Sequence, residues 1–124
     1  MNTRGHNERS FRLDTLAGDA RKGLERVQNG EADAIEGWLA YGAALNEGRS
    51  LFPGDKEFGE WVEANSLRQL VGAEINDHER AAAMWAAANS DQFEEARAAG
   101  KARTVRGIHA KWKEIEAECE RERL

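Results

Sequence analysis

The sequence has a single cysteine, a single proline and no long apolar run. Because Cys119 has no partner within the chain, an internal disulfide is excluded, and a free thiol is typical of a reducing compartment. No apolar stretch approaches the roughly 18 residues that a membrane-spanning helix needs. The first ten residues, MNTRGHNERS, lack the apolar core of a signal peptide. We therefore expect a cytoplasmic protein.

Recognisable arrangements of catalytic or metal-binding residues are also missing. The sequence has no glycine-rich phosphate loop, no zinc-ligand spacing and no nucleophile motif. The histidines His6, His78 and His109 are too scattered for a metal site, which needs three or four convergent ligands. Asp77 and Glu79 flank His78, but consecutive helix residues point in different directions. We expect a non-enzymatic protein with no catalytic residue, no metal site and no cofactor.

What the sequence does have is a composition that favours helices. Alanine, glutamate, arginine and leucine are abundant, and β-branched residues are scarce. With 33% charged and 40% hydrophobic residues, amphipathic helices with solvated outer faces are expected. A length of 124 residues is typical of one domain. The prediction is an all-α fold, a compact bundle of five to six helices with a long C-terminal helix.

Apolar spacing and stop signals place these helices along the chain. We predict a flexible N-terminal arm over residues 1–10 and a single helical domain over residues 11–124. Asn65 and Ser66 either end the third helix or start a short helix through Leu67, Leu70 and Val71, which Gly72 would close. Asn76 with Glu79 fits a capping box that opens the fourth helix. The predicted helices cover about residues 11–28, 31–49, 55–65, 76–88, 90–100 and 101–122.

The centre of the bundle is expected in residues 55–88, which have the outline of a helix-turn-helix. Gly42, on the apolar face of the preceding helix, is expected to permit close approach of another helix. Large aromatic side chains at helical spacing usually belong to a core, although they can also stack on nucleic-acid bases. We expect the core for all four tryptophans, which are Trp38, Trp61, Trp85 and Trp112.

Charge is spread unevenly along the chain, whose formal net charge is −5. Residues 31–95 carry four basic and fourteen acidic side chains, whereas residues 96–113 carry six basic side chains and no acidic one. That number of phosphate contacts would be enough for strongly salt-dependent binding to nucleic acid. The alternative is a solvated helix surface that balances the acidic body. The members of this basic block are Arg97, Lys101, Arg103, Arg106, Lys111 and Lys113.

The last predicted helix carries apolar residues at intervals of three, four, three and four. This spacing is that of a heptad seam over about two heptads. Two interpretations stay open, because the seam could pair two chains or fold back on its own core. A homodimer would form through Val105, Ile108, Trp112 and Ile115, with Cys119 at the end of the seam.

Three groups of residues form a pattern over residues 37–90. They are Gly42, Leu45 and Glu47, then Phe58 and Trp61, and then Glu79, Arg80, Ala81, Ala82 and Met84. With this pattern, the segment resembles a group of small helical proteins of bacteriophages and other mobile elements. The resemblance implies a helix-turn-helix core related to plasmid and phage DNA-binding proteins. It also implies that the helix over residues 76–88 enters the major groove of DNA, with Arg80 near the bases.

Two functional hypotheses follow. In the first, this is a regulator-like, DNA-binding or DNA-associated protein of a phage or mobile element, with the basic block on phosphates. In the second, an acidic surface mimics nucleic acid and inhibits a host nucleic-acid-processing complex by binding one of its proteins. The acidic side chains of that surface are Glu47, Asp55, Glu57, Glu60 and Glu63.

Overall fold

A computed structural model describes residues 3–70 and 73–123 of the chain, and of residues 3–7 and 31–33 it describes only the backbone. The described residues form six helices and one short antiparallel hairpin, which confirms the all-α fold class. None of these helices is long and apolar enough to cross a membrane. The elements in chain order are α1 (Thr3–Val27), α2 (Glu31–Ser50), α3 (Asp55–Ala64), β1 (Gln69–Leu70), β2 (Ala73–Glu74), α4 (Asp77–Ala88), α5 (Ser90–Ala99) and α6 (Val105–Arg123).

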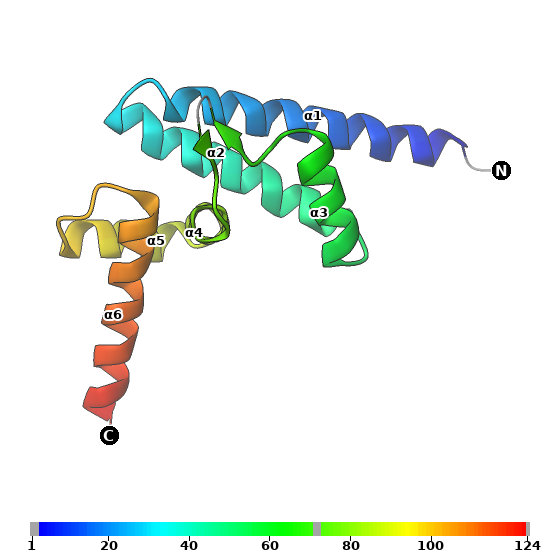
Figure 1. Ribbon diagram of the computed structural model, residues 1–124. Coiled ribbons are helices and arrows are strands. Elements are labelled where there is room, and N and C mark those ends of the chain that lie inside the picture. Colours follow the sequence, from blue (N-terminus) through cyan, green and yellow to red (C-terminus); the bar gives the residue numbers. More distant parts are fainter. Residues whose placement is uncertain (1–2, 71–72, 124) are drawn as a thin grey trace.

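Helices α1 and α2 lie side by side and antiparallel, and they form one layer of the molecule (Figure 1). Two glycines permit this close packing. A Cβ atom on Gly23 would lie 2.6 Å from the carbonyl oxygen of Gly37, and one on Gly37 would lie 2.4 Å from that of Gly23. The cost of glycine within a helix is therefore offset here by the approach of two backbones.

Helix α4 packs against α2 and is seen nearly end-on in Figure 1. The contact is made at Gly42, where an added Cβ atom would lie 2.0 Å from the carbonyl oxygen of Ala83. The side-chain amide of Asn46 donates a hydrogen bond to the carbonyl oxygen of Met84, at 2.9 Å. The predicted close approach of another helix at Gly42 is thus confirmed, and the partner is α4.

Two hydrophobic cores lie on either side of this contact. The first joins α1, α2, α3 and Ala83 of α4 to the residues that flank the hairpin, and the second joins α2, α4, α5 and α6. Trp38 packs against both cores. Trp61 is only 9% exposed, while Trp85 and Trp112 are half-buried against the second core. The expected core placement of the tryptophans is confirmed.

The first helix begins earlier than predicted. The expected start near Phe11 is wrong, since α1 begins at Thr3 and includes residues that we assigned to an arm. The guanidinium of Arg9 donates to the carbonyl oxygen of Leu51, at 2.8 and 3.1 Å, and lies 4.9 Å from the ring centroid of Phe52. A helix that is already held by tertiary packing extends at little cost, because each added residue gains a hydrogen bond.

Residues 69–74 differ from the predicted short helix. Gln69 pairs with Glu74 and Leu70 with Ala73 in an antiparallel hairpin, whose tip lies outside the described residues, as does Val71. Leu67 and Ile75 flank the hairpin and are fully buried in the first core. Burial of these two anchors holds the segment extended, which local propensity alone did not predict.

Candidate nucleic-acid interface

Helix α4 begins with the predicted capping box. The side chain of Asn76 accepts a hydrogen bond from the backbone N–H of Glu79 at 2.8 Å, and the carboxylate of Glu79 accepts from the N–H of Asn76 at 3.4 Å. This pair of bonds satisfies two of the helix's free donors and fixes its first turn. It thereby determines where His78 and Arg80 project.

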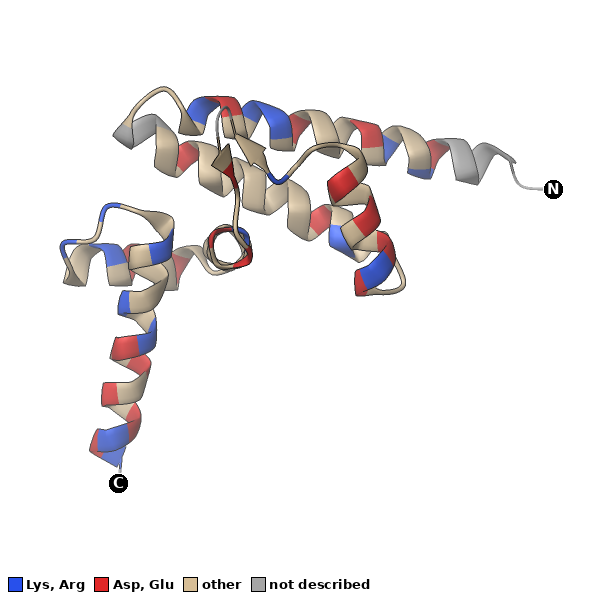
Figure 2. Cartoon of the chain, viewed as in Figure 1, with Lys and Arg blue, Asp and Glu red and all other residues tan. Residues whose placement is uncertain are grey.

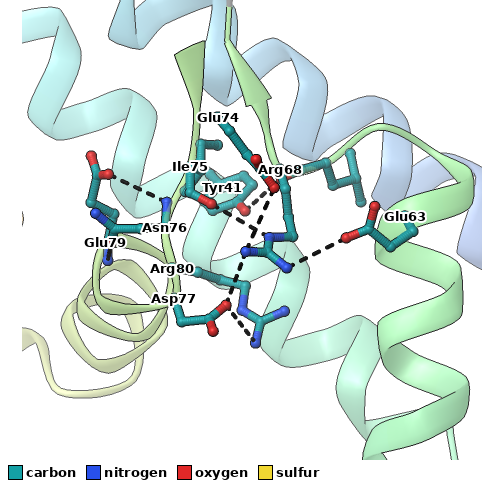
Figure 3. A network of polar contacts seen from close by, with 10 residues as sticks. Tyr41, Glu63, Arg68, Glu74, Ile75, Asn76, Asp77, Glu79 and Arg80 are labelled. Atoms are coloured by element: carbon teal, nitrogen blue, oxygen red, sulfur yellow. Dashed lines mark hydrogen bonds and ion pairs between the residues drawn. The ribbon is translucent and has the colours of Figure 1, made fainter.

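Arg80 is directed toward α3 and not outward. Its guanidinium carbon lies 5.9 Å from the ring centroid of Phe58, and its Nη2 atom lies 3.9 Å from the carboxylate of Asp77. The side chain is only 26% exposed. Figure 3 shows Arg80 beside Asp77 and Arg68, inside a network of polar contacts. The structure therefore does not bring Arg80 together with the basic block.

Arg68 is the centre of that network. Its guanidinium lies 3.4 Å from the carboxylate of Glu63, 3.8 Å from that of Glu74 and 3.2 Å from that of Asp77 (Figure 3). Its Nε atom also donates to the carbonyl oxygen of Ile75, at 3.4 Å. One cation thus connects α3, the hairpin and α4. The sequence offered no signal for this role.

The connection between α3 and α4 differs from that of a standard helix-turn-helix. Residues 65–76 lie between the two helices and contain the hairpin, whereas the motif uses a turn of three or four residues. Helix α4 instead packs mainly on α2, through Gly42 and Ala83. Gly42, one of the residues behind the predicted resemblance, therefore serves here as a packing contact between α2 and α4.

The basic block occupies α5, the connection that follows it and the first half of α6 (Figure 2). Arg97 and Lys111 each pair within their own helix, with Glu94 at 3.7 Å and with Glu114 at 3.6 Å. Among the described residues, Lys101, Arg106 and Lys113 are exposed and have no ion pair. Arg103 is exposed in the connection before α6.

Part of this block lines a shallow groove between α4 and α6. The groove has a volume of about 140 Å³. Its α6 side has the spacing of one helix face, and no carboxylate belongs to its lining. The lining consists of His78 and Ala81 from α4 and of Arg106, His109, Ala110 and Lys113 from α6.

His109 occupies the inner part of this groove. Its imidazole stacks on the indole of Trp85, with ring centroids 4.5 Å apart and an interplanar angle of 20°. Burial lowers the pKa of His109, and the positive charge of Lys113 lowers it further, while Glu116 acts in the opposite direction. The side chain of His109 is half-buried. Only the packing of α4 on α6 brings His78 and His109 together.

The acidic surface is largely neutralised within the chain. Glu47 pairs with Arg12 of α1, Asp55 pairs with Arg49 at 3.0 Å, and Glu63 pairs with Arg68. Glu57 and Glu60 are exposed on α3, and neither forms an ion pair with another described residue. The predicted protein-binding face is thus reduced to two uncompensated carboxylates, which weakens nucleic-acid mimicry.

The heptad seam divides at the middle of α6. Val105 and Ile108 are 3% and 0% exposed and belong to the second core, so their predicted contact with another chain is wrong. Trp112 and Ile115 are half-buried, and Cys119 is exposed. The first half of the seam is buried in the second core, to which α4 and α5 also contribute. Burial within one chain costs less entropy than association of two chains.

No group of three or more histidine, cysteine or acidic side chains in the described part of the chain is arranged to hold a metal ion. The comparisons with known proteins add no functional assignment. No protein-family model matches the chain, and no significant similarity was found to a curated protein or to a solved structure. The resemblance of residues 37–90 to phage and mobile-element proteins stays a prediction. The function is argued from the groove itself.

Proposed function

We propose that this is a non-enzymatic DNA-binding protein that contacts the phosphates of duplex DNA through the groove between α4 and α6. The observation that supports the proposal most is the lining of this groove, which combines Arg106 and Lys113 with two imidazoles and contains no carboxylate. The neighbouring Lys101 and Arg103, both exposed, extend the positive surface toward α5.

The overall negative charge of the chain does not exclude this mode of binding. The carboxylates of Glu47, Asp55 and Glu63 are paired with arginines, so their repulsion of phosphate is reduced. Charges that lie farther from a bound phosphate than the Debye length, about 8 Å at physiological ionic strength, are largely screened. A local basic groove can therefore bind DNA in a protein of net charge −5.

Contacts with phosphates fit the site better than reading of bases. Arg80, which would read bases in a helix-turn-helix, lies over Phe58. The outward residues of α4 include Asp77, His78 and Ala81, which offer few donors to base edges. We therefore propose binding with little sequence preference. The resemblance to phage and mobile-element proteins agrees with a DNA-associated, regulator-like role.

A salt series of binding to mixed-sequence duplex DNA tests the proposal. We expect binding that weakens steeply with salt, since each phosphate contact contributes about 0.9 to the slope of log affinity against log salt. The double variant Arg106→Gln with Lys101→Gln removes two exposed, unpaired cations, so the slope should fall by about 2.

The matched control is Lys22→Gln with Lys56→Gln, which makes the same change of charge at exposed positions of α1 and α3. This control should bind DNA like the parent protein at every salt concentration. Equal losses in the two double variants would place the contact elsewhere. No binding even at low salt would reject the proposal and direct attention to Glu57 and Glu60.

A further inference from the structure

The second half of α6 extends away from the helical bundle toward the C-terminal end (Figure 1). From Glu116 to Arg123 every residue is exposed. Beside this part of the helix lies an open groove of about 360 Å³ that no other element of the described chain fills. The lining combines Trp112, Ile115 and Cys119 with the charged residues Glu95, Glu116, Glu120 and Arg123.

Charge changes sign along α6 at the same point. From Val105 to Lys113 the helix carries three basic side chains and no acidic one. From Glu114 to Arg123 it carries five acidic side chains and two basic ones, and both of these arginines lie in the last turn. The helix therefore has a basic first half and a second half of net negative charge that ends in a basic turn, as Figure 2 shows.

We propose that the second half of α6 binds the α6 helix of a second copy of this chain, in antiparallel orientation. An antiparallel pair places the acidic half of each helix beside the basic half of the other. The half-buried Trp112 and Ile115, together with Cys119, form the apolar line between the two helices. This proposal stands on α6 alone and does not depend on DNA binding.

The positions around the helix make the charge match specific. With Trp112 of one chain opposite Cys119 of the other, Lys111 lies opposite Glu118 and Glu122 of its partner. Lys113, on the other side of the apolar line, lies opposite Glu116 and Glu120. At 3.6 residues per turn, Lys111, Glu118 and Glu122 lie on one side of the apolar line, and Lys113, Glu116 and Glu120 lie on the other side. In an antiparallel pair, residues on the same side of the line in the two helices face each other.

A parallel pair would be disfavoured by the same charges. It would place the five glutamates of one chain beside those of the other, and it would place Lys111 and Lys113 beside their own copies. The charges of α6 are complementary to those of a second α6 helix only when the two helices are antiparallel. We therefore expect a second copy of this chain to occupy the groove.

The test uses two charge-reversed chains and the molecular mass in solution. One chain carries Lys111→Glu with Lys113→Glu, so both halves of α6 become acidic. The other carries Glu118→Lys with Glu120→Lys, which removes the acidic character of the second half. Lys113, Glu118 and Glu120 are exposed and Lys111 is half-buried, so far-UV circular dichroism checks that the helices are retained.

We expect the parent protein to sediment at twice the monomer mass of 13.8 kDa at about 100 μM. Each reversed chain alone should dimerise at least about 10-fold more weakly. An equimolar mixture of the two should regain the parent's affinity. The pair Lys22→Glu with Lys56→Glu changes charge outside α6 and should leave the mass unchanged.

Three results of these measurements would overturn the proposal, and a fourth comes from Cys119. They are a parent protein that stays monomeric at about 100 μM, reversed chains that dimerise as well as the parent, and a mixture that does not recover. A Cys119–Cys119 disulfide that forms readily under mild oxidation would indicate parallel helices and would also reject it. If a double variant loses helical signal, Lys111→Glu and Glu118→Lys as single variants repeat the mixing experiment with half the change of charge.

Discussion

Tyr41 is the buried polar residue that connects α2 to the hairpin. It is fully buried, and its hydroxyl donates to the carbonyl oxygen of Leu67 at 2.6 Å. Burial raises the pKa of Tyr41 far above its ordinary value, so the neutral, donating form is retained. This hydrogen bond satisfies a carbonyl at the base of the hairpin, where solvent does not reach the tyrosine.

Replacing Tyr41 by phenylalanine should therefore destabilise the fold. The variant keeps the ring but leaves the carbonyl of Leu67 without its donor, at a cost of about 1–2 kcal/mol in the free energy of unfolding. Urea titration followed by tryptophan fluorescence measures the change. The control Thr15→Val removes an exposed hydroxyl that bonds within α1 and should have a smaller effect. Equal effects would contradict this account.

His109 makes the proposed DNA contact sensitive to pH. Burial and Lys113 lower its pKa, so the neutral imidazole is favoured in the free protein. The stability that this shift contributes is present above the unfolded pKa of about 6.5, and it is lost as pH falls through the lower folded value. A phosphate in the groove has the opposite effect, because it favours the charged imidazole.

DNA binding should consequently take up a proton at His109. Affinity for duplex DNA should rise as pH falls from about 7.5 to about 6, and it should rise less in His109→Gln. Fluorescence anisotropy at constant ionic strength measures both proteins. The same pH dependence in parent and variant would exclude His109 from the phosphate contact. A weaker affinity at low pH would contradict the sign of the linkage.

At the scale of the elements, the crossing of α2 and α4 decides the architecture. Gly42 allows the backbone of α4 to lie directly on α2, because an added Cβ atom would lie 2.0 Å from the carbonyl oxygen of Ala83. Rigid backbone, and not a flexible side chain, occupies that space. The two helices would have to separate, which would also move the hydrogen bond between Asn46 and Met84.

The substitution Gly42→Ala should thus reduce stability strongly, by about 2 kcal/mol or more, through overpacking. Gly18→Ala is the matched control, since nothing lies within 4 Å of an added Cβ atom on that exposed position of α1. The control should be stabilised by about 0.5–1 kcal/mol, because alanine favours a helix over glycine. Thermal and urea unfolding measure both. A Gly42→Ala variant as stable as the parent would refute the close crossing.

The hairpin between α3 and α4 is held by both its ends. Leu67 and Ile75 are buried in the first core, and Arg68 contacts carboxylates from three elements. Each of these exposed ion pairs contributes little by itself. Their convergence on the guanidinium of Arg68 sets how α3 and α4 lie relative to each other. Arg68 and Arg80 are both engaged in these contacts within the chain, so neither is free to contact DNA bases.

At the scale of the whole molecule, the unpaired basic side chains and the acidic side chains lie in different parts of the structure. The carboxylates of Glu47, Asp55 and Glu63 in α2 and α3 are paired with arginines, whereas Lys101, Arg106 and Lys113 have no ion pair in the described chain. An antiparallel pair of α6 helices would place Lys113 of each groove beside glutamates of the partner, and it would relate the remaining cations, Lys101 and Arg106, by a two-fold axis. Two linked grooves bind a long duplex more tightly than one groove, because the second contact is intramolecular.

Much of the fold was predictable from local sequence. The helix over residues 31–49, the capping box of Asn76 and Glu79, and the close approach at Gly42 depend on residues only a few positions apart or on one face of a helix. The candidate site was predictable only in part. The basic block identified the α6 side of the groove. His78 lies in α4, and it lines the groove only because α4 packs against α6.

The sequence by itself determined the all-α class, most helix boundaries and the segregation of charge, because propensity, capping and turn chemistry act within one or two helical turns. Tertiary structure alone decided where long side chains point and which apolar residues stay accessible. It turned Arg80 onto Phe58 and buried Val105 and Ile108, yet left Trp112 half-exposed. These outcomes depend on which surfaces meet, and distant parts of the chain supply those surfaces.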